Sequence, residues 1–336
     1  MKKIESASLI ELNTFGIEAK AKLLIHYKTE EELLLLIQSG TILNNKVLHI
    51  GGGSNLLFLS DFDGTILHSE IKYINIVGEN DSTVAVQVGA GIVWDDFVAY
   101  AVENGWGGIE NLSLIPGEVG ASAIQNIGAY GVEVCDVIKE VHAINLKTGA
   151  KEIFNNHDCN YAYRESIFKQ ELKGQFAITS VIFELQKNPA FKLGYQHLES
   201  QVLQNGALTL SNIRNTIIAV RESKLPDPKL AGNAGSFFMN PVVSRMQFEN
   251  IQSNYPEIPH YYVSNELEKI PAAWLIDQCG WKGKTVGNAG VHHNQALVLV
   301  NKGGATGAEI AHLATLIQQS VFEKFGIHLT PEVNFI

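Results

Sequence analysis

The chain has 336 residues, of which 46% are hydrophobic and 18% are charged, and its formal net charge at pH 7 is −10. This length exceeds what one ordinary hydrophobic core accommodates and predicts a soluble protein of two or three domains. The negative charge disfavours nucleic-acid binding, because proteins that bind DNA or RNA usually present a basic surface. An anionic ligand would need local cations, such as Lys224 and Lys229.

Three scattered cysteines occur in the chain, at Cys135, Cys159 and Cys279. They form neither a metal-binding spacing nor a disulfide framework, which is typical of a reducing compartment. The adjacent histidines His292 and His293 also lack the spacing of helical metal ligands, so we expect them to be structural and expect no metal site. No apolar run approaches the roughly 20 residues needed to cross a bilayer. We therefore expect a cytoplasmic protein without membrane insertion.

The N-terminal half is predicted to mix strands and helices. Thr29 and Glu32 form a capping-box pattern that opens a helix, and Gly40 can end it. The other predicted elements are, in chain order, strands at 47–50, 71–77 and 83–88, a helix at 94–104, hairpin strands at 137–146 and 151–154, and a strand at 177–185. A glycine-rich apolar segment lies between them at 114–131.

In the C-terminal half, Ser211 is predicted to cap a helix that extends to about Ser223. The motif Leu225-Pro-Asp-Pro228 follows, and its prolines indicate a domain boundary. A helix is expected at 272–279 and a buried strand at 296–300.

Thr306 and Glu309 form a second capping-box pattern at the start of a long helix. One face of this helix carries apolar residues at helical spacing: Ile310, Leu313, Ala314, Ile317 and Val321. The stripe predicts a face buried in the core.

Three glycine-rich regions lie near predicted strand ends, at 51–55, 89–91 and 115–131. Exposed backbone N–H groups in such loops can cradle phosphate oxygens, although an ordinary turn explains any single loop. Neither G-x-G pattern is a Rossmann fingerprint, because Leu56 and Trp94 stand where the third glycine belongs. The regions together predict one long ligand, and a dinucleotide bound outside a Rossmann fold points to FAD.

Ser236 follows Gly235 and precedes Phe237 and Phe238, and it is not part of a G-x-S-x-G nucleophile elbow. Glycine allows the backbone to approach a ligand closely, and the two aromatic rings can exclude water. In this setting the hydroxyl is expected to be a positioned proton donor rather than a nucleophile.

The chain resembles the UDP-N-acetylenolpyruvoylglucosamine reductase (MurB) family almost from end to end. In the first half the matching motifs are Asn13-Thr-Phe-Gly16, Gly53-Ser-Asn55, Ile115-Pro-Gly117, Ile124-Gln-Asn-Ile-Gly-Ala-Tyr-Gly131, Tyr163-Arg164 and Ser166-Ile-Phe168. In the second half they are Lys224-Leu-Pro-Asp-Pro228, Gly235-Ser-Phe-Phe238, Trp274-Leu-Ile-Asp277, Ala296-Leu-Val298 and Pro331-Glu-Val333. Their number and order make the resemblance specific.

The resemblance implies an α+β fold with a two-part FAD-binding region of the vanillyl-alcohol oxidase (PCMH) type and a C-terminal α+β substrate-binding domain. We expect the two FAD-binding parts at 1–69 and 70–220 and the substrate-binding domain at 221–336. The segment around Tyr195 resembles the lid loop of type I members. A monomer is expected.

The resemblance also implies the reaction. Family members use NADPH and non-covalently bound FAD to reduce UDP-N-acetylglucosamine enolpyruvate to UDP-N-acetylmuramate, a precursor of peptidoglycan. Hydride reaches the β-carbon of the enolpyruvyl group, and a proton then reaches the α-carbon.

Three residues match the family's catalytic positions: Arg164, Ser236 and Glu332. Arg164 is expected to hold the substrate carboxylate in a bidentate fork and to stabilise the charge that develops on it. Ser236 is expected to donate the proton. Glu332 is expected to assist Arg164, either as the protonated acid or through a water molecule.

Binding positions follow from the same resemblance. Those expected to contact FAD are Gly51, Gly52, Gly53, Ser54, Asn55, Gly89, Gly91, Pro116, Gly117, Gly120, Ser122, Asn126, Gly128, Tyr130 and Gly131. Those expected to contact the UDP-sugar are Tyr195, Lys224, Asn240, Tyr261 and Gln295. The sequence departs from the family pattern at Gly52, Ala162 and Met239, and Met239 stands where a lysine is common.

Two other functions fit parts of the pattern. An oxidase with the same flavin fold would consume oxygen and would not favour UDP-sugars. A flavin- or nucleotide-sugar-binding protein without turnover would not need a proton donor, so the presence of Ser236 with Arg164 and Glu332 disfavours it.

Overall fold

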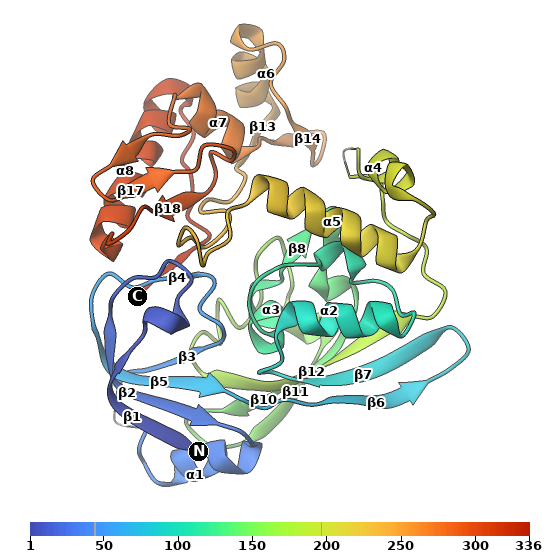
Figure 1. Ribbon diagram of the computed structural model, residues 1–336, viewed down its shortest axis with the longest axis vertical. Coiled ribbons are helices and arrows are strands. Elements are labelled where there is room, and N and C mark those ends of the chain that lie inside the picture. The colour runs from blue at the N-terminus through green and yellow to red at the C-terminus, as the bar shows by residue number, and fades with distance from the viewer. Residues whose placement is uncertain (44, 196) are drawn as a thin grey trace. The chain divides into compact units, whose positions relative to one another are not determined.

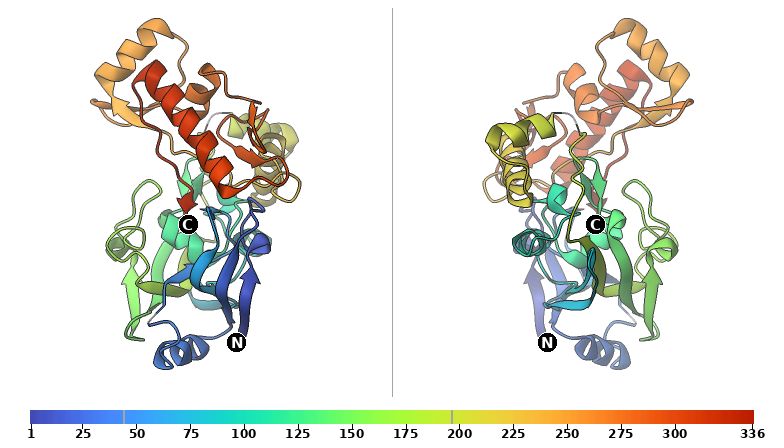
Figure 2. Two further views of the ribbon diagram at one scale, coloured as in Figure 1. Left: turned by 90° about the vertical axis from the view of Figure 1, so that its left-hand side faces the viewer. Right: turned by 90° about the vertical axis from the view of Figure 1, so that its right-hand side faces the viewer.

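The structure is a computed structural model that describes residues 1–43, 45–195 and 197–336 (Figures 1 and 2). The chain forms two compact units, and each is assembled from segments that are distant in the sequence. The first unit contains residues 1–7, 21–52 and 63–221, and the second contains 8–20, 53–62 and 222–336. No helix in the described ranges has the length and apolar character needed to span a membrane.

The first unit contains a four-stranded sheet with the order β1-β2-β5-β3. Its strands are β1 Lys2–Ser8, β2 Lys20–Tyr27, β3 Val47–Ile50 and β5 Phe62–Ser69. β3 and β5 run parallel, with Ile50 opposite His68. Helix α1 Glu30–Gln38 contributes Leu33, Leu36 and Ile37 to the core on this sheet.

A five-stranded antiparallel sheet with the order β11-β10-β12-β7-β6 forms the centre of the first unit. Its strands are β6 Ile74–Glu79, β7 Thr83–Gly89, β10 Ile138–Asn145, β11 Lys151–Asn155 and β12 Phe176–Gln186. Helices α2 Trp94–Glu103 and α3 Val119–Gln125 cover one face of it (Figure 1). Trp94, Phe97 and Phe183 are fully buried there, and burying a side chain of this kind stabilises a fold by about 1.5–3 kcal/mol.

Two further helices are α4 Leu198–Asn205, in the first unit, and α5 Leu210–Lys224, which belongs to the first unit up to Arg221. Their apolar faces form a separate small core that includes Leu198, Val202, Ile213 and Ile217. Arg214 of α5 donates two hydrogen bonds to the Asp95 carboxylate of α2, at 2.6 and 2.8 Å. This bidentate pair fixes α5 to the start of α2.

The second unit contains short strands around three helices. The strands are β4 Leu56–Leu57, β13 Val242–Ser244, β14 Tyr261–Tyr262, β15 Leu267–Lys269, β16 Thr285–Val286, β17 Ala289–Val291, β18 Leu299–Asn301 and β19 Asn334–Phe335. The helices are α6 Arg245–Asn254, α7 Ala272–Gln278 and α8 Gly307–Phe325. α8 packs against β17 and β18 (Figure 2).

Short elements complete the two units. They are the 3₁₀ helices η1 Ile10–Leu12, η2 Glu110–Leu112, η3 Val134–Asp136 and η4 Asn156–Cys159, and the paired strands β8 Gly128–Ala129 and β9 Val132–Glu133.

Most predicted helices and strands are confirmed. The capping box of α8 is complete, since the Thr306 hydroxyl accepts the Glu309 N–H at 3.2 Å and Glu309 accepts the Thr306 N–H at 2.8 Å. All five residues of its predicted stripe are buried. The box at α1 is half formed, because Glu32 accepts the N–H of Lys28 rather than that of Thr29.

The strand predicted at 71–77 was misplaced, and β6 begins only at Ile74. The segment before it bonds to the glycine turn instead, because Gly89 donates to the Tyr73 carbonyl at 2.9 Å and Gly91 donates to the Ile71 carbonyl at 3.0 Å.

Other sequence predictions were wrong or incomplete. Ser211 does not cap α5, since the helix begins at Leu210 and the Thr209 hydroxyl accepts the Asn212 N–H at 3.1 Å. The strand predicted at 296–300 is shorter, because a turn joins the Val298 N–H to the Gln295 carbonyl at 3.1 Å before β18 begins. The sequence did not predict β1, β2, β5, α3, α4 or α6.

Candidate active site

Two glycine loops of the first unit meet although they are far apart in the sequence. Gly51 and Gly52 follow β3, and a Cβ on Gly51 would lie 3.2 Å from Oε2 of Glu118. A Cβ on Gly52 would lie 3.7 Å from the Cα of Gly117. The missing side chains therefore let the two loops pack closely against each other.

The remaining glycines of this region serve mainly to pack backbone against backbone. A Cβ on Gly89 would lie 2.4 Å from the Ile71 carbonyl oxygen, and one on Gly91 would lie 2.4 Å from that of Ser69. A Cβ on Gly120 would lie 2.8 Å from the Cβ of Ala90. The N–H groups of all three glycines donate to backbone carbonyls. A cofactor at these positions would therefore contact atoms other than these N–H groups.

The side chain of Asn126 holds the loop after α3, and that of Ser122 bonds to the backbone within α3. Asn126 has φ +48°, and its amide donates to the Ala162 carbonyl at 2.8 Å while its oxygen accepts the Cys135 N–H at 3.2 Å. The buried Ser122 hydroxyl donates to the Val119 carbonyl at 2.7 Å. Both residues thus have a clear structural role in shaping the predicted cofactor loop.

Arg164 lies beside this loop in an unusual backbone conformation. Its φ is +58°, which is uncommon for a residue with a side chain and is found disproportionately at functional sites. The guanidinium donates to the Gly128 carbonyl at 2.6 Å, lies 3.4 Å from a carboxylate oxygen of Glu133, and stacks over the Tyr163 ring at 5.0 Å. These contacts orient the fork in a largely buried position.

Tyr130 and Tyr195 also meet in the first unit. Tyr130 has φ +49°, and its ring is 5.8 Å from that of Tyr195 in an edge-on arrangement. A Cβ on Gly131 would lie 3.8 Å from the Cβ of Tyr195. The predicted lid residue therefore contacts the end of the predicted cofactor loop.

The segments that carry Ser236 and Glu332 pair with each other in the second unit. Phe238 and Pro331 form an antiparallel bridge, and the Glu332 N–H donates to the Phe237 carbonyl at 2.9 Å. Phe237 and Phe238 are buried, whereas Ser236 is exposed. The rings anchor the segment, and the side chain of Ser236 is left exposed.

The loop from Gly53 to Asn55, in the second unit, is hydrogen-bonded to the segment that carries Glu332. Asn55 donates through its amide to the Glu332 carbonyl at 3.1 Å and accepts the Asn334 N–H at 3.0 Å. Gly53 has φ +65°, and a Cβ there would lie 1.8 Å from the Leu12 carbonyl oxygen. The predicted cofactor residues Gly53 to Asn55 thus form one framework with Glu332.

The predicted substrate residues of the second unit come from separate elements. Lys224 is the last residue of α5, and Tyr261 lies in β14. The Asn240 side-chain oxygen accepts the Ala272 N–H at 2.9 Å, where α7 begins. Gln295 accepts the Leu297 N–H at 3.4 Å.

Arg221 is a candidate that the sequence reasoning missed. Burial lowers the pKa of its guanidinium, while Tyr130 and Asp95 favour the charged form. Its buried Nε has no hydrogen-bond partner in the described part of the chain. A half-buried cation with an unused donor suits an anionic ligand, and its position three residues before Lys224 on α5 was the available signal.

Two family models match the chain. Residues 21–151 match the FAD binding domain, and residues 227–336 match the C-terminal domain of UDP-N-acetylenolpyruvoylglucosamine reductase. The reductase of that name from Bacteroides fragilis is 52% identical over 98% of each chain.

Solved structures agree on the fold. The MurB structure from Thermus caldophilus covers 99% of this chain and 98% of its own, with a TM-score of 0.70 at 21% identity. That of 6-hydroxy-D-nicotine oxidase from Arthrobacter nicotinovorans covers 97% of this chain and 86% of its own, with a TM-score of 0.55 at 12% identity. The predicted α+β fold, with an FAD-binding region of the vanillyl-alcohol oxidase type and a MurB C-terminal domain, is thereby confirmed. The chain belongs to the UDP-N-acetylenolpyruvoylglucosamine reductase family.

Proposed function

We propose that the chain catalyses the NADPH-dependent reduction of UDP-N-acetylglucosamine enolpyruvate to UDP-N-acetylmuramate, a step in peptidoglycan synthesis. The observation that supports this proposal is the bridge between Phe238 and Pro331, which joins the segment of the exposed Ser236 to that of Glu332. Membership in the reductase family, at 52% identity over nearly the whole chain, supports the choice of substrate.

Bound FAD would supply the hydride, after NADPH has reduced it. The residues proposed to hold it lie in the three glycine-rich loops: Gly51, Gly52, Gly53, Ser54, Asn55, Gly89, Gly91, Pro116, Gly117, Gly120, Ser122, Asn126, Gly128, Tyr130 and Gly131. The match of residues 21–151 to the FAD binding domain supports this assignment.

Arg164 is proposed to bind the carboxylate of the enolpyruvyl group. Hydride addition at the β-carbon breaks the carbon–carbon π bond and places its electron pair on the α-carbon and the carboxylate. A guanidinium already oriented by Gly128 and Tyr163 stabilises this charge without reorganising.

Ser236 is proposed to complete the reaction by donating its proton to the α-carbon, which gives the lactyl ether. Glu332, as the neutral acid or through a water molecule, would support Arg164 at the carboxylate. Solvent then returns a proton to the serine, so atoms and electrons balance.

The UDP-sugar is proposed to contact Tyr195, Lys224, Asn240, Tyr261 and Gln295. Lys224 offers a compact cation for the diphosphate. We also propose the division into parts at 1–69, 70–220 and 221–336, a monomeric state and a cytoplasmic location.

An anaerobic experiment in two steps tests the function. NADPH is added to the yellow protein until the flavin bleaches, and the enolpyruvyl substrate is then added. Rapid return of the colour supports the reductase. Bleaching followed by recovery only in air would instead support an oxidase, and a protein without flavin would overturn the proposal.

A further inference from the structure

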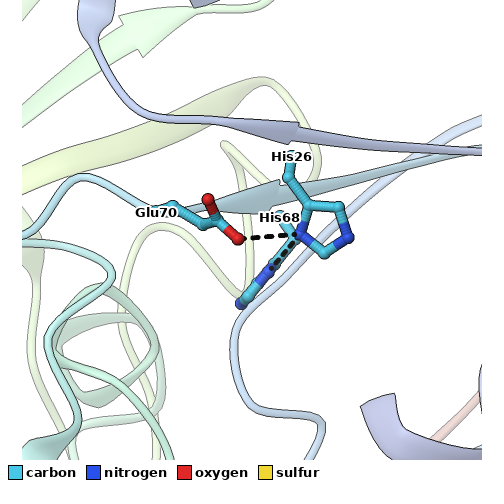
Figure 3. A group of neighbouring side chains, drawn as sticks. All are labelled: His26, His68 and Glu70. Atoms are coloured by element: carbon cyan, nitrogen blue, oxygen red, sulfur yellow. Dashed lines mark hydrogen bonds and ion pairs between the residues drawn. The ribbon is translucent and has the colours of Figure 1, made fainter. Parts of the chain in front are cut away.

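The side chains of His26 and His68 meet on neighbouring strands of the first unit, β2 and β5 (Figure 3). Their Nδ1 atoms are 3.0 Å apart, and Oε1 of Glu70 lies 3.5 Å from Nδ1 of His26. Among the described residues this is the only group of three histidine, cysteine or acidic side chains whose ligand atoms lie within 4.8 Å of one another.

Two of the three spacings between these atoms are close to those of ligands around a small metal ion, and all three atoms lie within 4.8 Å of one another. Zinc binds imidazole nitrogen and carboxylate oxygen at about 2.0–2.1 Å in tetrahedral geometry, which separates neighbouring ligand atoms by about 3.3 Å. The distances of 3.0 and 3.5 Å in the cluster lie on either side of that value. An ion could therefore enter with small side-chain movements.

A fourth side chain orients one of the two histidines. Nε2 of His68 lies 2.9 Å from Oε1 of Glu118, whose side chain is only 10% exposed. When Nε2–H donates to this carboxylate, Nδ1 of His68 carries the lone pair and directs it at the cluster. A carboxylate behind a metal-binding histidine is the usual arrangement in protein metal sites.

The cluster is sheltered but remains accessible from one side. The side chains of His26 and His68 are 15% and 13% exposed, and that of Glu70 is 32% exposed. A water molecule could take the fourth position from the side of Glu70. Lys28 lies 3.9 Å from Oε2 of Glu70, but it is 69% exposed and can move away.

We propose that His26, His68 and Glu70 bind a divalent transition-metal ion of the zinc class, with Glu118 as the residue that orients His68. Two imidazoles and one carboxylate suit zinc better than magnesium or calcium, which prefer oxygen ligands. The ion is structural, because it uses none of the proposed catalytic residues.

Zinc binding to the flavin-loaded protein, without an affinity tag, tests this site. Zn²⁺ is titrated in competition with a chromophoric chelator. The wild type should bind one zinc ion with a dissociation constant in the micromolar range or lower. His26→Ala and His68→Ala should each weaken binding by more than about 100-fold, and Glu118→Gln should weaken it by about 10–100-fold.

His312→Ala is the matched control, because His312 is exposed on α8 of the other unit. It should bind zinc as the wild type does. Flavin content and the melting temperature report whether each variant is folded, and zinc should raise the melting temperature of the wild type but not of His26→Ala.

Co²⁺ gives a second measurement that depends on geometry. Tetrahedral cobalt should produce intense absorption at wavelengths beyond the flavin band in the wild type, and His68→Ala should lose it. The proposal is overturned if the wild type binds no zinc, or if the folded variants at His26 and His68 bind it unchanged. The two histidines would then form only a hydrogen-bonded pair.

Discussion

The glycine turn of the first unit and the Ser236 segment of the second unit use glycine for different reasons. At Gly89 and Gly91 a side chain would collide with backbone oxygens at 2.4 Å, so these residues allow two chain segments to pack closely. At Gly235 there is open space, but φ is +68°. Here glycine is needed for the turn that presents Ser236.

The proposed roles of the two units therefore depend on different structural features. The proposed cofactor loops of the first unit depend mainly on backbone packing. Arg164 is the one proposed catalytic side chain of this unit. In the second unit, backbone pairing joins the segments that carry the proposed catalytic residues Ser236 and Glu332. Substitutions in the two regions should therefore affect different quantities, namely folding with cofactor retention in the first and proton transfer in the second.

The largest effect is expected for Ser236→Ala. NADPH should still bleach the flavin at nearly the wild-type rate, because this step needs no proton from the serine. Transfer to the enolpyruvyl substrate should fall by roughly 10²–10⁴-fold. Stopped-flow absorbance measures both half-reactions separately, and an equal loss in both would remove Ser236 from its proposed role.

Gly89→Ala should act on stability instead. Its Cβ would lie 2.4 Å from the Ile71 oxygen, and we expect it to lower the free energy of unfolding by about 3 kcal/mol. Gly78→Ala in β6 is the matched control, since its Cβ would meet only the Cβ of Ala85 at 3.9 Å. Urea unfolding and retained FAD should distinguish the two variants. Equal stability would contradict the packing role.

Arg164→Lys tests whether the first unit also contributes a reacting side chain. Lysine keeps the charge but cannot form the bidentate fork. We expect transfer to the substrate to fall by about 10²-fold with flavin reduction little changed. Single-turnover experiments measure the rate of each step. A loss of FAD binding without a slower transfer step would instead assign Arg164 a role in binding the cofactor.

The sequence predicted those parts of the fold that depend on neighbouring residues. Helix α8 carries its cap and its apolar stripe within one segment, so both were found. Strands β2 and β5 were missed because their pairing joins distant segments, and the cluster of His26 with His68 was therefore missed too. The contrast shows that local signals are readable, whereas long-range pairing is not.

The candidate site shows the same limit. Ser236 stood out through its glycine and aromatic neighbours, but composition alone did not place it beside Glu332. The bridge between Phe238 and Pro331 joins the two distant segments, and only the family resemblance suggested that Ser236 and Glu332 act together. Arg221 was missed because it is a candidate only through the burial of its guanidinium. A helical sequence pattern does not reveal that burial.

The smallest effect is expected for Gly235→Ala. This variant tests most directly whether the turn before Ser236 needs glycine. Nothing lies within 4 Å of the added Cβ, so the cost comes only from φ +68° and should be about 1–2 kcal/mol of unfolding free energy. Gly16→Ala is matched to it, with φ +62° and equally open space.

Both variants should lose similar stability in urea unfolding, because both force alanine into the left-handed region. Only Gly235→Ala should also slow transfer to the substrate, since only this turn precedes Ser236 and sets the direction of its hydroxyl. Equal transfer rates in the two variants would show that the segment tolerates a shifted turn. Phe237 and Phe238, anchored in the core, would then suffice to place the serine.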